Sequence, residues 1–318
     1  MRLHFWLVRL ASLTRASLGC VLLFICVASC GGSAATPKPS PFTSGVQHAS
    51  LTVNGLKRTY RLYAPPSLDP SQPVPLVLVL NGCPSTGDEM ASLTGFDHPA
   101  ATARFVAVYP DPTPDANAAP SNLSEGCWNA GTCCDDASRN SVDDFTFIKR
   151  LLDQLTADSR IDKTRVFAAG LASGGMMAYR LACQLSDRIV AAASVAGALV
   201  FQPCQPARPV SILEMHGTDD FIVPYDGGFG GNFEFRSTAS IIQRWVSLDG
   251  CTGLPTHAVN GITKTSTWIH CHAGTMVRLD TVTGGKHTWF GSGMDPTPGE
   301  PNSTATVWDF FKNLAPTV

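Results

Sequence analysis

Residues 166–180 read V-F-A-A-G-L-A-S-G-G-M-M-A-Y-R, and this stretch indicates the fold more directly than any other part of the chain. Its beginning is apolar like a buried strand, and its second half has the pattern of a helix. Between them, Gly170 and Gly174 flank position 172. Small residues two before and two after one position are typical of a sharp strand-to-helix turn that presents the central side chain at its tip. The alternative is an ordinary glycine-rich junction.

Strands and helices alternate along the rest of the chain. Continuous apolar runs of the kind found in parallel sheets predict strands at residues 75–80, 104–109, 165–169, 189–195, 210–215 and 277–282. Helical spacing predicts helices at residues 143–155, 174–185, 237–248 and 304–314. Alternating residues 51–63 around Asn54-Gly55 predict a hairpin. We therefore expect an α/β fold with a mostly parallel central sheet, helices on both faces and an N-terminal antiparallel hairpin.

The composition fits one large domain without a polyanionic partner. The chain has 318 residues, of which 44% are hydrophobic and 15% charged, so it can bury a large core. The formal net charge is −2 and no run of lysine and arginine occurs, so we expect no nucleic acid partner. No internal repeat or second domain boundary is visible, and we expect a monomer.

The N-terminal residues have the features of an export signal. Arginines precede an apolar run at residues 16–28, which is too short to span a bilayer comfortably. The run ends in V-A-S-C-G, which resembles the bacterial lipobox and predicts lipidation of Cys30. An ordinary signal cut after Ala35 is the alternative. We expect a signal peptide at 1–29, a flexible tether at 30–46 and a single α/β domain at 47–318. We expect this domain to be held in the cell envelope only by the lipid anchor.

The cysteines agree with export. Apart from Cys20, Cys26 and Cys30, eight of the eleven remain, and an even number in an exported chain predicts up to four disulfides. We expect Cys183–Cys204 and Cys251–Cys271, with the other four cysteines paired among themselves. The runs H-C-H at 270–272 and C-C at 133–134 lack the two separated ligand pairs of a zinc site, so we expect no metal and no other cofactor.

Three further loops follow predicted strands and carry reactive residue types. Residues 81–87 read N-G-C-P-S-T-G, residues 216–220 read H-G-T-D-D, and residues 284–289 read G-G-K-H-T-W. Active groups of open α/β sheets collect in loops at the carboxyl ends of strands. The order of a tight turn, an aspartate and a histidine along the chain is that of α/β-hydrolases. Each loop by itself has an ordinary structural explanation.

Together these residues resemble the secreted polyhydroxybutyrate depolymerase and feruloyl esterase group of α/β-hydrolases. The runs G-G-M-M-A-Y-R-L-A-C and H-G-T-D-D-F-I-V-P-Y-D-G-G are the most specific. The matching stretches cover the domain from about residue 50 almost to its end, and they are residues 61–65, 76–83, 127–129, 142–144, 165–183, 195–198, 216–228 and 284–291.

The resemblance implies roles for individual residues. Position 172 would carry the nucleophile, with Asp220 as the acid and His287 as the base. Backbone N–H groups of Cys83 and Ser173 would form the oxyanion hole. Trp128 and Trp289 would be walls of the substrate cleft, with ordinary packing as the alternative for both. Asn81 departs from the pattern, since the family usually has histidine there.

The other departure is decisive, because Ala172 stands where the family has its catalytic serine. A methyl group cannot attack a carbonyl. We consider three interpretations: an esterase inactivated by engineering, a natural relative that binds esters without cleaving them, and an esterase that uses Ser173 as a fallback nucleophile. The last would place Leu171 in the crowded flank of the turn.

The predicted function is that of a carboxylic-ester hydrolase scaffold for a small ester or a short polyester. A lipid-anchored ester-binding protein is the competing class, and a redox or metal protein built on the cysteines is a third. The sequence does not identify the ester.

Overall fold

The central sheet of the computed structural model has ten strands among the described residues, which are 42–66, 68–114, 126–134, 138 and 141–314. These residues belong to one unit, Ser40–Val318. The predicted signal peptide and Cys30 lie outside them. Within the described ranges, no helix is long and apolar enough to cross a membrane.

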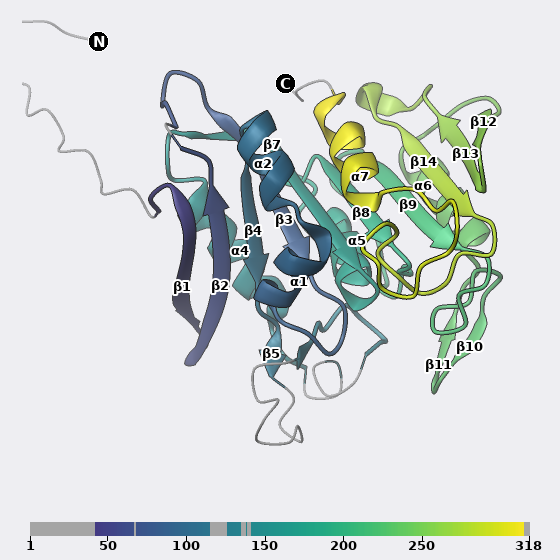
Figure 1. The fold of residues 1–318 in the computed structure, drawn as a ribbon, viewed down its shortest axis with the longest axis horizontal. Coiled ribbons are helices and arrows are strands. Elements are labelled where there is room, and N and C mark those ends of the chain that lie inside the picture. The colour runs from purple at the N-terminus through teal and green to yellow at the C-terminus, as the bar shows by residue number, and fades with distance from the viewer. Residues whose placement is uncertain (1–41, 67, 115–125, 135–137, 139–140, 315–318) are drawn as a thin grey trace, which may run out of the picture. The chain divides into compact units, whose positions relative to one another are not determined.

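The strand order is β1-β2-β4-β3-β7-β8-β9-β14-β13-β12 (Figure 1). The strands are β1 (Gly45–Val53), β2 (Leu56–Ala64), β3 (Val74–Leu80), β4 (Val106–Pro110), β7 (Ile161–Leu171), β8 (Ala191–Val195), β9 (Ser211–Gly217), β12 (Thr256–Asn260), β13 (Thr263–Trp268) and β14 (Val277–Val282). Strands β4, β3, β7, β8, β9 and β14 pair in parallel, so the expected α/β fold with a mostly parallel sheet is confirmed.

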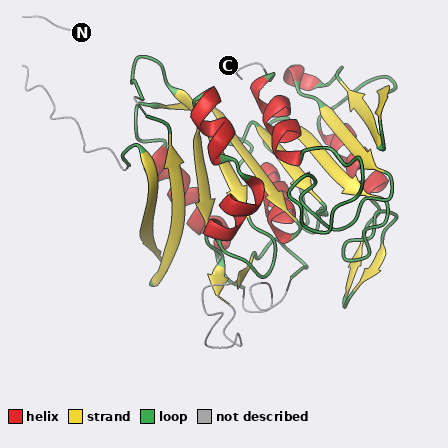
Figure 2. Ribbon diagram, in the orientation of Figure 1, coloured by secondary structure: helices red, strands yellow, loops and turns green. Residues whose placement is uncertain are grey.

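Helices cover both faces of the sheet, as predicted (Figure 2). One face packs against α1 (Gly87–Thr94), α2 (Asp97–Ala103) and α7 (Ser303–Lys312), and the other against α4 (Asp144–Leu155), α5 (Ser173–Gln184) and α6 (Thr238–Leu248). Each layer has its own hydrophobic cluster, because the parallel strands are buried on both sides. Helices α1 and α2 were not predicted, although the run T-G-D-E forms a capping box between Thr86 and Glu89.

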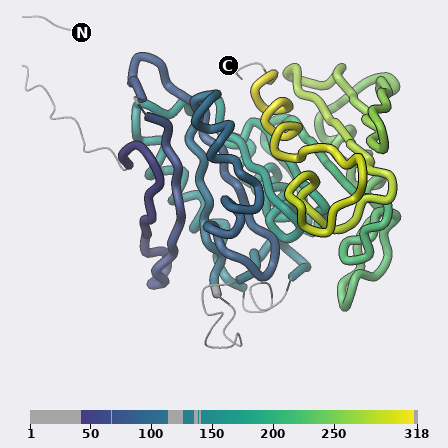
Figure 3. Tube along the Cα trace, viewed as in Figure 1, coloured from purple at the N-terminus to yellow at the C-terminus, as the bar shows by residue number. Residues whose placement is uncertain are grey.

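Both edges of the sheet are antiparallel. The predicted hairpin is β1–β2, and its turn residues Asn54 and Gly55 have the positive φ that a two-residue hairpin turn requires. At the other edge, β13 pairs antiparallel with β14, and β12 pairs antiparallel with β13. Figure 3 shows this part of the chain opposite the N-terminal hairpin. The second edge was missed because every residue of β12 is exposed, so no apolar run marks it.

The hairpin corrects one predicted boundary. The tether was expected to reach residue 46, but Gly45 and Val46 already belong to β1, where they pair with Ala64 and Tyr63. Backbone pairing with β2 orders these residues although they add little apolar surface.

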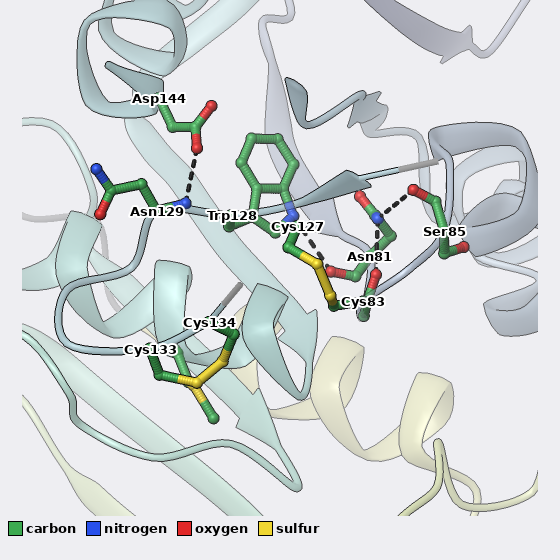
Figure 4. The surroundings of a disulfide bond; sticks show 11 residues. Asn81, Cys83, Ser85, Cys127, Trp128, Asn129, Cys133, Cys134 and Asp144 are labelled. Carbon is green, nitrogen blue, oxygen red and sulfur yellow. Dashed lines mark hydrogen bonds between the residues drawn. A yellow bond between two sulfur atoms is a disulfide. The ribbon is translucent and has the colours of Figure 1, made fainter. Parts of the chain in front are cut away.

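The four predicted disulfides are present. Cys183–Cys204 and Cys251–Cys271 are confirmed, and the remaining four cysteines pair as Cys83–Cys127 and Cys133–Cys134 (Figure 4). No group of metal-ligating side chains lies together among the described residues. The cysteines therefore serve as cross-links in an arrangement that fits an exported protein.

One buried carboxyl makes the stability of this fold depend on pH. Asp249 ends α6 and is fully buried, and its Oδ1 accepts a hydrogen bond from the backbone N–H of Val210 at 3.0 Å, whereas Oδ2 has no partner among the described residues. Burial raises the pKa of Asp249 to about 7, and the Val210 hydrogen bond opposes this only in part. The folded state therefore holds this proton more tightly than the unfolded chain does.

We expect Asp249→Asn to stabilise the domain by about 2 kcal/mol more at pH 8 than at pH 5. A raised pKa in the folded state gives a contribution that is full below the unfolded value, near 3.9, and lost as the pH rises through about 7. Asparagine keeps the acceptor for Val210 but cannot ionise. Urea unfolding at both pH values measures the difference, with exposed Asp187→Asn as the control. Equal destabilisation by Asp249→Asn at both pH values would contradict the expectation.

Candidate active site

The turn between β7 and α5 places residue 172 at its tip. Ala172 has φ 51° and ψ −117° and is the N-cap of α5. This conformation is uncommon for a residue with a side chain and costs about 1–3 kcal/mol, and such strain is concentrated at functional sites. The side chain is only partly buried. The tight turn predicted from the sequence is therefore present, with position 172 at its centre.

The two flanking glycines are required by close backbone contacts. A Cβ on Gly170 would lie 2.3 Å from the carbonyl carbon of Gly174, and a Cβ on Gly174 would lie 2.2 Å from the carbonyl oxygen of Leu80. Both distances are too short for any side chain. The G-x-X-x-G spacing is therefore a steric condition for bringing β7, α5 and the end of β3 together.

Ser173, the fallback nucleophile, points into the protein. It is the first residue of α5, only 2% of it is exposed, and its Oγ has no hydrogen-bond partner among the described residues. A hydroxyl buried in this way does not face a substrate. The geometry therefore favours position 172 over position 173 as the reactive one.

The loop after β3 lies against this turn. A Cβ built on Gly82 would lie 3.7 Å from the Cβ of Ala172. Asn81 braces the loop, because its Nδ2 donates to the carbonyl oxygens of Gly82 at 2.8 Å and Ser85 at 2.7 Å (Figure 4). The adjoining Cys83 is cross-linked to Cys127. The resemblance assigns the backbone N–H of Cys83 in this loop to the oxyanion hole. Gly82, the residue before Cys83, lies beside residue 172.

Asp220 and His287 form a hydrogen-bonded pair. Nδ1 of His287 lies 2.8 Å from Oδ2 of Asp220. The other oxygen, Oδ1, accepts the backbone N–H groups of Ile222 at 2.9 Å and Val223 at 2.8 Å, which fixes the carboxylate plane. The His287 side chain is 18% exposed, whereas the Asp220 side chain is fully buried. This is the orientation in which a carboxylate holds an imidazole as a general base.

The pair and the turn lie at the same edge of the sheet. Strands β7, β8, β9 and β14 are neighbours and parallel, so their carboxyl ends meet there. Backbone hydrogen bonds of 2.9 to 3.0 Å join the loops that follow these strands, through Ala172–Val195, Ala196–Met215, Thr218–Val282 and Asp219–Gly285. The turn at Ala172, the loop after β9 and the loop after β14 are therefore held at one edge of the sheet, in the chain order that the sequence predicted.

Residues 58–217, half of the chain, match the family model described as "Esterase PHB depolymerase". This chain belongs to that family. The matched segment includes the strained turn at Ala172 and ends before Asp220 and His287. By family the protein is a hydrolase, and its fold is that of the α/β-hydrolases.

Similar proteins have esterase names. "Feruloyl esterase B" of Piromyces equi is 35% identical over 170 residues, which are 50% of this chain and 31% of that protein. "Putative esterase NocK" of Nocardia uniformis subsp. tsuyamanensis is 30% identical over 276 residues, which are 80% of this chain and 77% of that protein. The solved acetyl xylan esterase from Aspergillus awamori covers 84% of this chain and 99% of its own, with a TM-score of 0.58 and 16% identity.

Next to Asp220 lies a buried group of titratable side chains that the sequence did not indicate. Nδ1 of His216 lies 2.8 Å from Oε1 of Glu214, and the hydroxyl of Tyr179 donates to Oε2 of Glu214 at 2.6 Å. On its other side, Nε2 of His216 lies 2.8 Å from the carbonyl oxygen of Val223 and 3.3 Å from Oδ2 of Asp220. His216 was part of a quoted loop, but nothing in that loop predicted its contact with Glu214.

This group affects the charge of Asp220. Burial would raise the pKa of Asp220, but the hydrogen bonds and charges of His216 and His287 outweigh burial and lower it to about 2. Burial would lower the pKa of His216, but Asp220 and Glu214 raise it to about 10. Asp220 is therefore an anion throughout the neutral range.

The two tryptophans are packed inside the protein. Trp128 and Trp289 have 0% and 1% of their surface exposed and belong to the two hydrophobic clusters. Each indole N–H is satisfied internally, with Trp128 donating to the carbonyl oxygen of Asn81 and Trp289 to Oγ1 of Thr304. Neither ring faces an open surface. The burial of both tryptophans therefore favours the alternative of ordinary packing over the predicted role as walls of the substrate cleft.

Proposed function

We propose that this domain is a carboxylic-ester hydrolase scaffold of the serine type, in which position 172 is the nucleophile site, Asp220 the acid and His287 the base. The observation that carries the proposal is the strained backbone of Ala172 at the sheet edge that also holds the Asp220–His287 pair. Strain of this kind is concentrated at functional sites, and a sharp strand-to-helix turn uses it to present a side chain to a substrate.

With serine at position 172, the chemistry follows from these positions. The serine Oγ attacks the ester carbonyl carbon while His287 accepts its proton through Nε2, since Nδ1 is held by Asp220. Backbone N–H groups of Cys83 and Ser173 stabilise the negative oxygen of the tetrahedral intermediate. The alcohol leaves with the proton from His287, and water then hydrolyses the acyl-enzyme by the same route.

With Ala172 no acyl-enzyme forms. The oxyanion hole and substrate binding alone then accelerate hydrolysis by only about 10³–10⁴-fold over the uncatalysed reaction in water. The chain in this form is therefore an inactive esterase or an ester-binding protein. The intact Asp220–His287 pair and the retained strain favour a loss that is recent or engineered, because a site without any use would not be expected to keep them.

The substrate we propose is an ester with an apolar acyl or aryl group. Phe221, which directly follows Asp220, is 72% exposed, and Phe229 on the hairpin β10 (Gly228–Gly230)–β11 (Phe233–Phe235) is 73% exposed. The hairpin packs on the same turn, since a Cβ on Gly230 would lie 1.9 Å from the carbonyl oxygen of Ile222. Exposed apolar side chains on segments next to Asp220 fit an apolar ligand. Feruloyl and acetyl xylan esters, named for relatives, are the first candidates.

The setting we propose is the cell envelope or the exterior, with a lipid on Cys30 as the anchor and a monomeric domain. Four disulfides support export. The lipid anchor itself rests on the sequence around Cys30.

A covalent probe tests the residue assignment. We expect a fluorophosphonate, which phosphorylates activated serines, to label Ala172→Ser at residue 172 and to leave the unmodified chain unlabelled, as read by peptide mass spectrometry. Ala172→Ser/His287→Gln is the control, because it keeps the hydroxyl and removes the base. Labelling of Ser173 in the unmodified chain would move the nucleophile to that residue.

A further inference from the structure

His216 has hydrogen-bond partners on both ring nitrogens, and it is completely buried. Nε2 faces the carbonyl oxygen of Val223 at 2.8 Å, and a carbonyl can only accept, so Nε2 carries a hydrogen. Nδ1 faces Oε1 of Glu214 at 2.8 Å. The charge of the ring therefore depends on whether the proton between His216 and Glu214 lies on the imidazole or on the carboxyl.

The surroundings favour the imidazolium. Oε2 of Glu214 accepts from the Tyr179 hydroxyl at 2.6 Å, which stabilises the carboxylate form. On the opposite side of the ring, Oδ2 of Asp220 lies 3.3 Å from Nε2 and adds a second negative charge. A neutral ring between two carboxyl groups would leave that charge unbalanced in a site without solvent. The centroid of the Tyr225 ring lies 5.8 Å from that of His216, edge-on. The Tyr225 hydroxyl forms its hydrogen bond with Oγ1 of Thr281.

We propose that His216 is a permanently charged positioning residue whose imidazolium, held by Glu214, keeps Asp220 ionised and aimed at His287. Oδ2 of Asp220 is shared between the two histidines, at 2.8 Å from His287 and 3.3 Å from His216. The shorter contact goes to the base. The inference rests on the proposed function for the role of His287, but the charge of His216 does not depend on catalysis.

The charge has a consequence for the base. A cation beside Asp220 favours the carboxylate form, so Oδ2 of Asp220 remains an acceptor for Nδ1 of His287. His216 therefore acts on the base only through Asp220, as a positioning residue.

The test is ¹⁵N NMR of the imidazole rings in the unmodified chain, which needs no activity. We expect His216 to be doubly protonated from pH 6 to pH 8.5, with two slowly exchanging ring protons, and we expect Glu214→Gln to lose one of them within this range. Glu234→Gln on the exposed face of β11 is the matched control and leaves His216 doubly protonated.

A singly protonated His216 at pH 7 in the unmodified chain would overturn the proposal, and this measurement stands even where Glu214→Gln fails to fold. Loss of a His216 ring proton in Glu234→Gln would also overturn it, since the effect would then be one of total charge. As a second readout, we expect kcat of Ala172→Ser/Glu214→Gln to fall below that of Ala172→Ser with KM little changed, and an unchanged kcat would reject the positioning role. An inactive Ala172→Ser variant would reject the proposed function, while the NMR spectra would still decide the charge of His216.

Discussion

Ala172→Ser is expected to raise the rate of p-nitrophenyl butyrate hydrolysis by roughly 10⁴–10⁶-fold over the unmodified chain, because losses of a triad serine are of this size. The change adds one oxygen to a side chain that is already at the tip of the turn and partly exposed. The positive φ of residue 172 is equally strained for alanine and serine, so the fold has nothing to rearrange. The measurement is kcat and KM for purified protein of each form.

A matched control separates the position from the chemistry. Ala273 is exposed and also has a positive φ, of 54°, although its ψ of 22° is that of the left-handed helical region, so Ala273→Ser adds an exposed hydroxyl at a positive-φ alanine outside the turn between β7 and α5. We expect it to leave the rate at the level of the unmodified chain. Strong activity of the unmodified chain that disappears in Ser173→Ala would reject position 172 as the nucleophile site.

Asp220→Asn in the Ala172→Ser background is expected to lower kcat by about 10⁴-fold with a much smaller effect on KM. Asparagine can keep its oxygen toward the N–H groups of Ile222 and Val223, which donate to Oδ1 in the present structure. Its NH₂ group then faces Nδ1 of His287, which must become an acceptor. The ring hydrogen moves to Nε2, and this nitrogen can no longer take a proton from the serine.

Asp219→Asn is the control for this experiment. Asp219 is adjacent in sequence but exposed, and its carboxylate accepts only from Thr218 at 3.1 Å among the described hydrogen bonds. We expect it to keep most of the activity. A comparable loss in both variants would show that the total charge of the loop matters and that Asp220 has no special role. Circular dichroism and thermal unfolding check that both variants are folded.

Much of this site was predictable because its local geometry depends on residues that are only a few positions apart in the sequence. The interval between Gly170 and Gly174 predicted the turn, and the structure supplies the steric reason in the contacts of both glycines. The hairpin at Asn54-Gly55 and most of the helices and parallel strands followed in the same way, from turn residues and apolar periodicity. The choice of Asp220 over Asp219 came only from the resemblance, since two adjacent aspartates look alike in a sequence.

Other features depended on contacts between distant residues. Trp128 and Trp289 could have been cleft walls or core residues, and only the packing around them showed that they are buried. The exposed edge strand β12 has no apolar pattern of its own and exists through pairing with β13.

The amino-acid order was sufficient for the fold class, the strained turn and the absence of a nucleophile at Ala172, because each depends on neighbours a few residues apart. The shared carboxylate of Asp220 was not accessible in this way. His287 lies 67 residues further along the chain than Asp220, and Tyr179 comes from helix α5. Burial strengthens these charges only once the strands align and water is excluded, so their protonation states are a property of the folded domain.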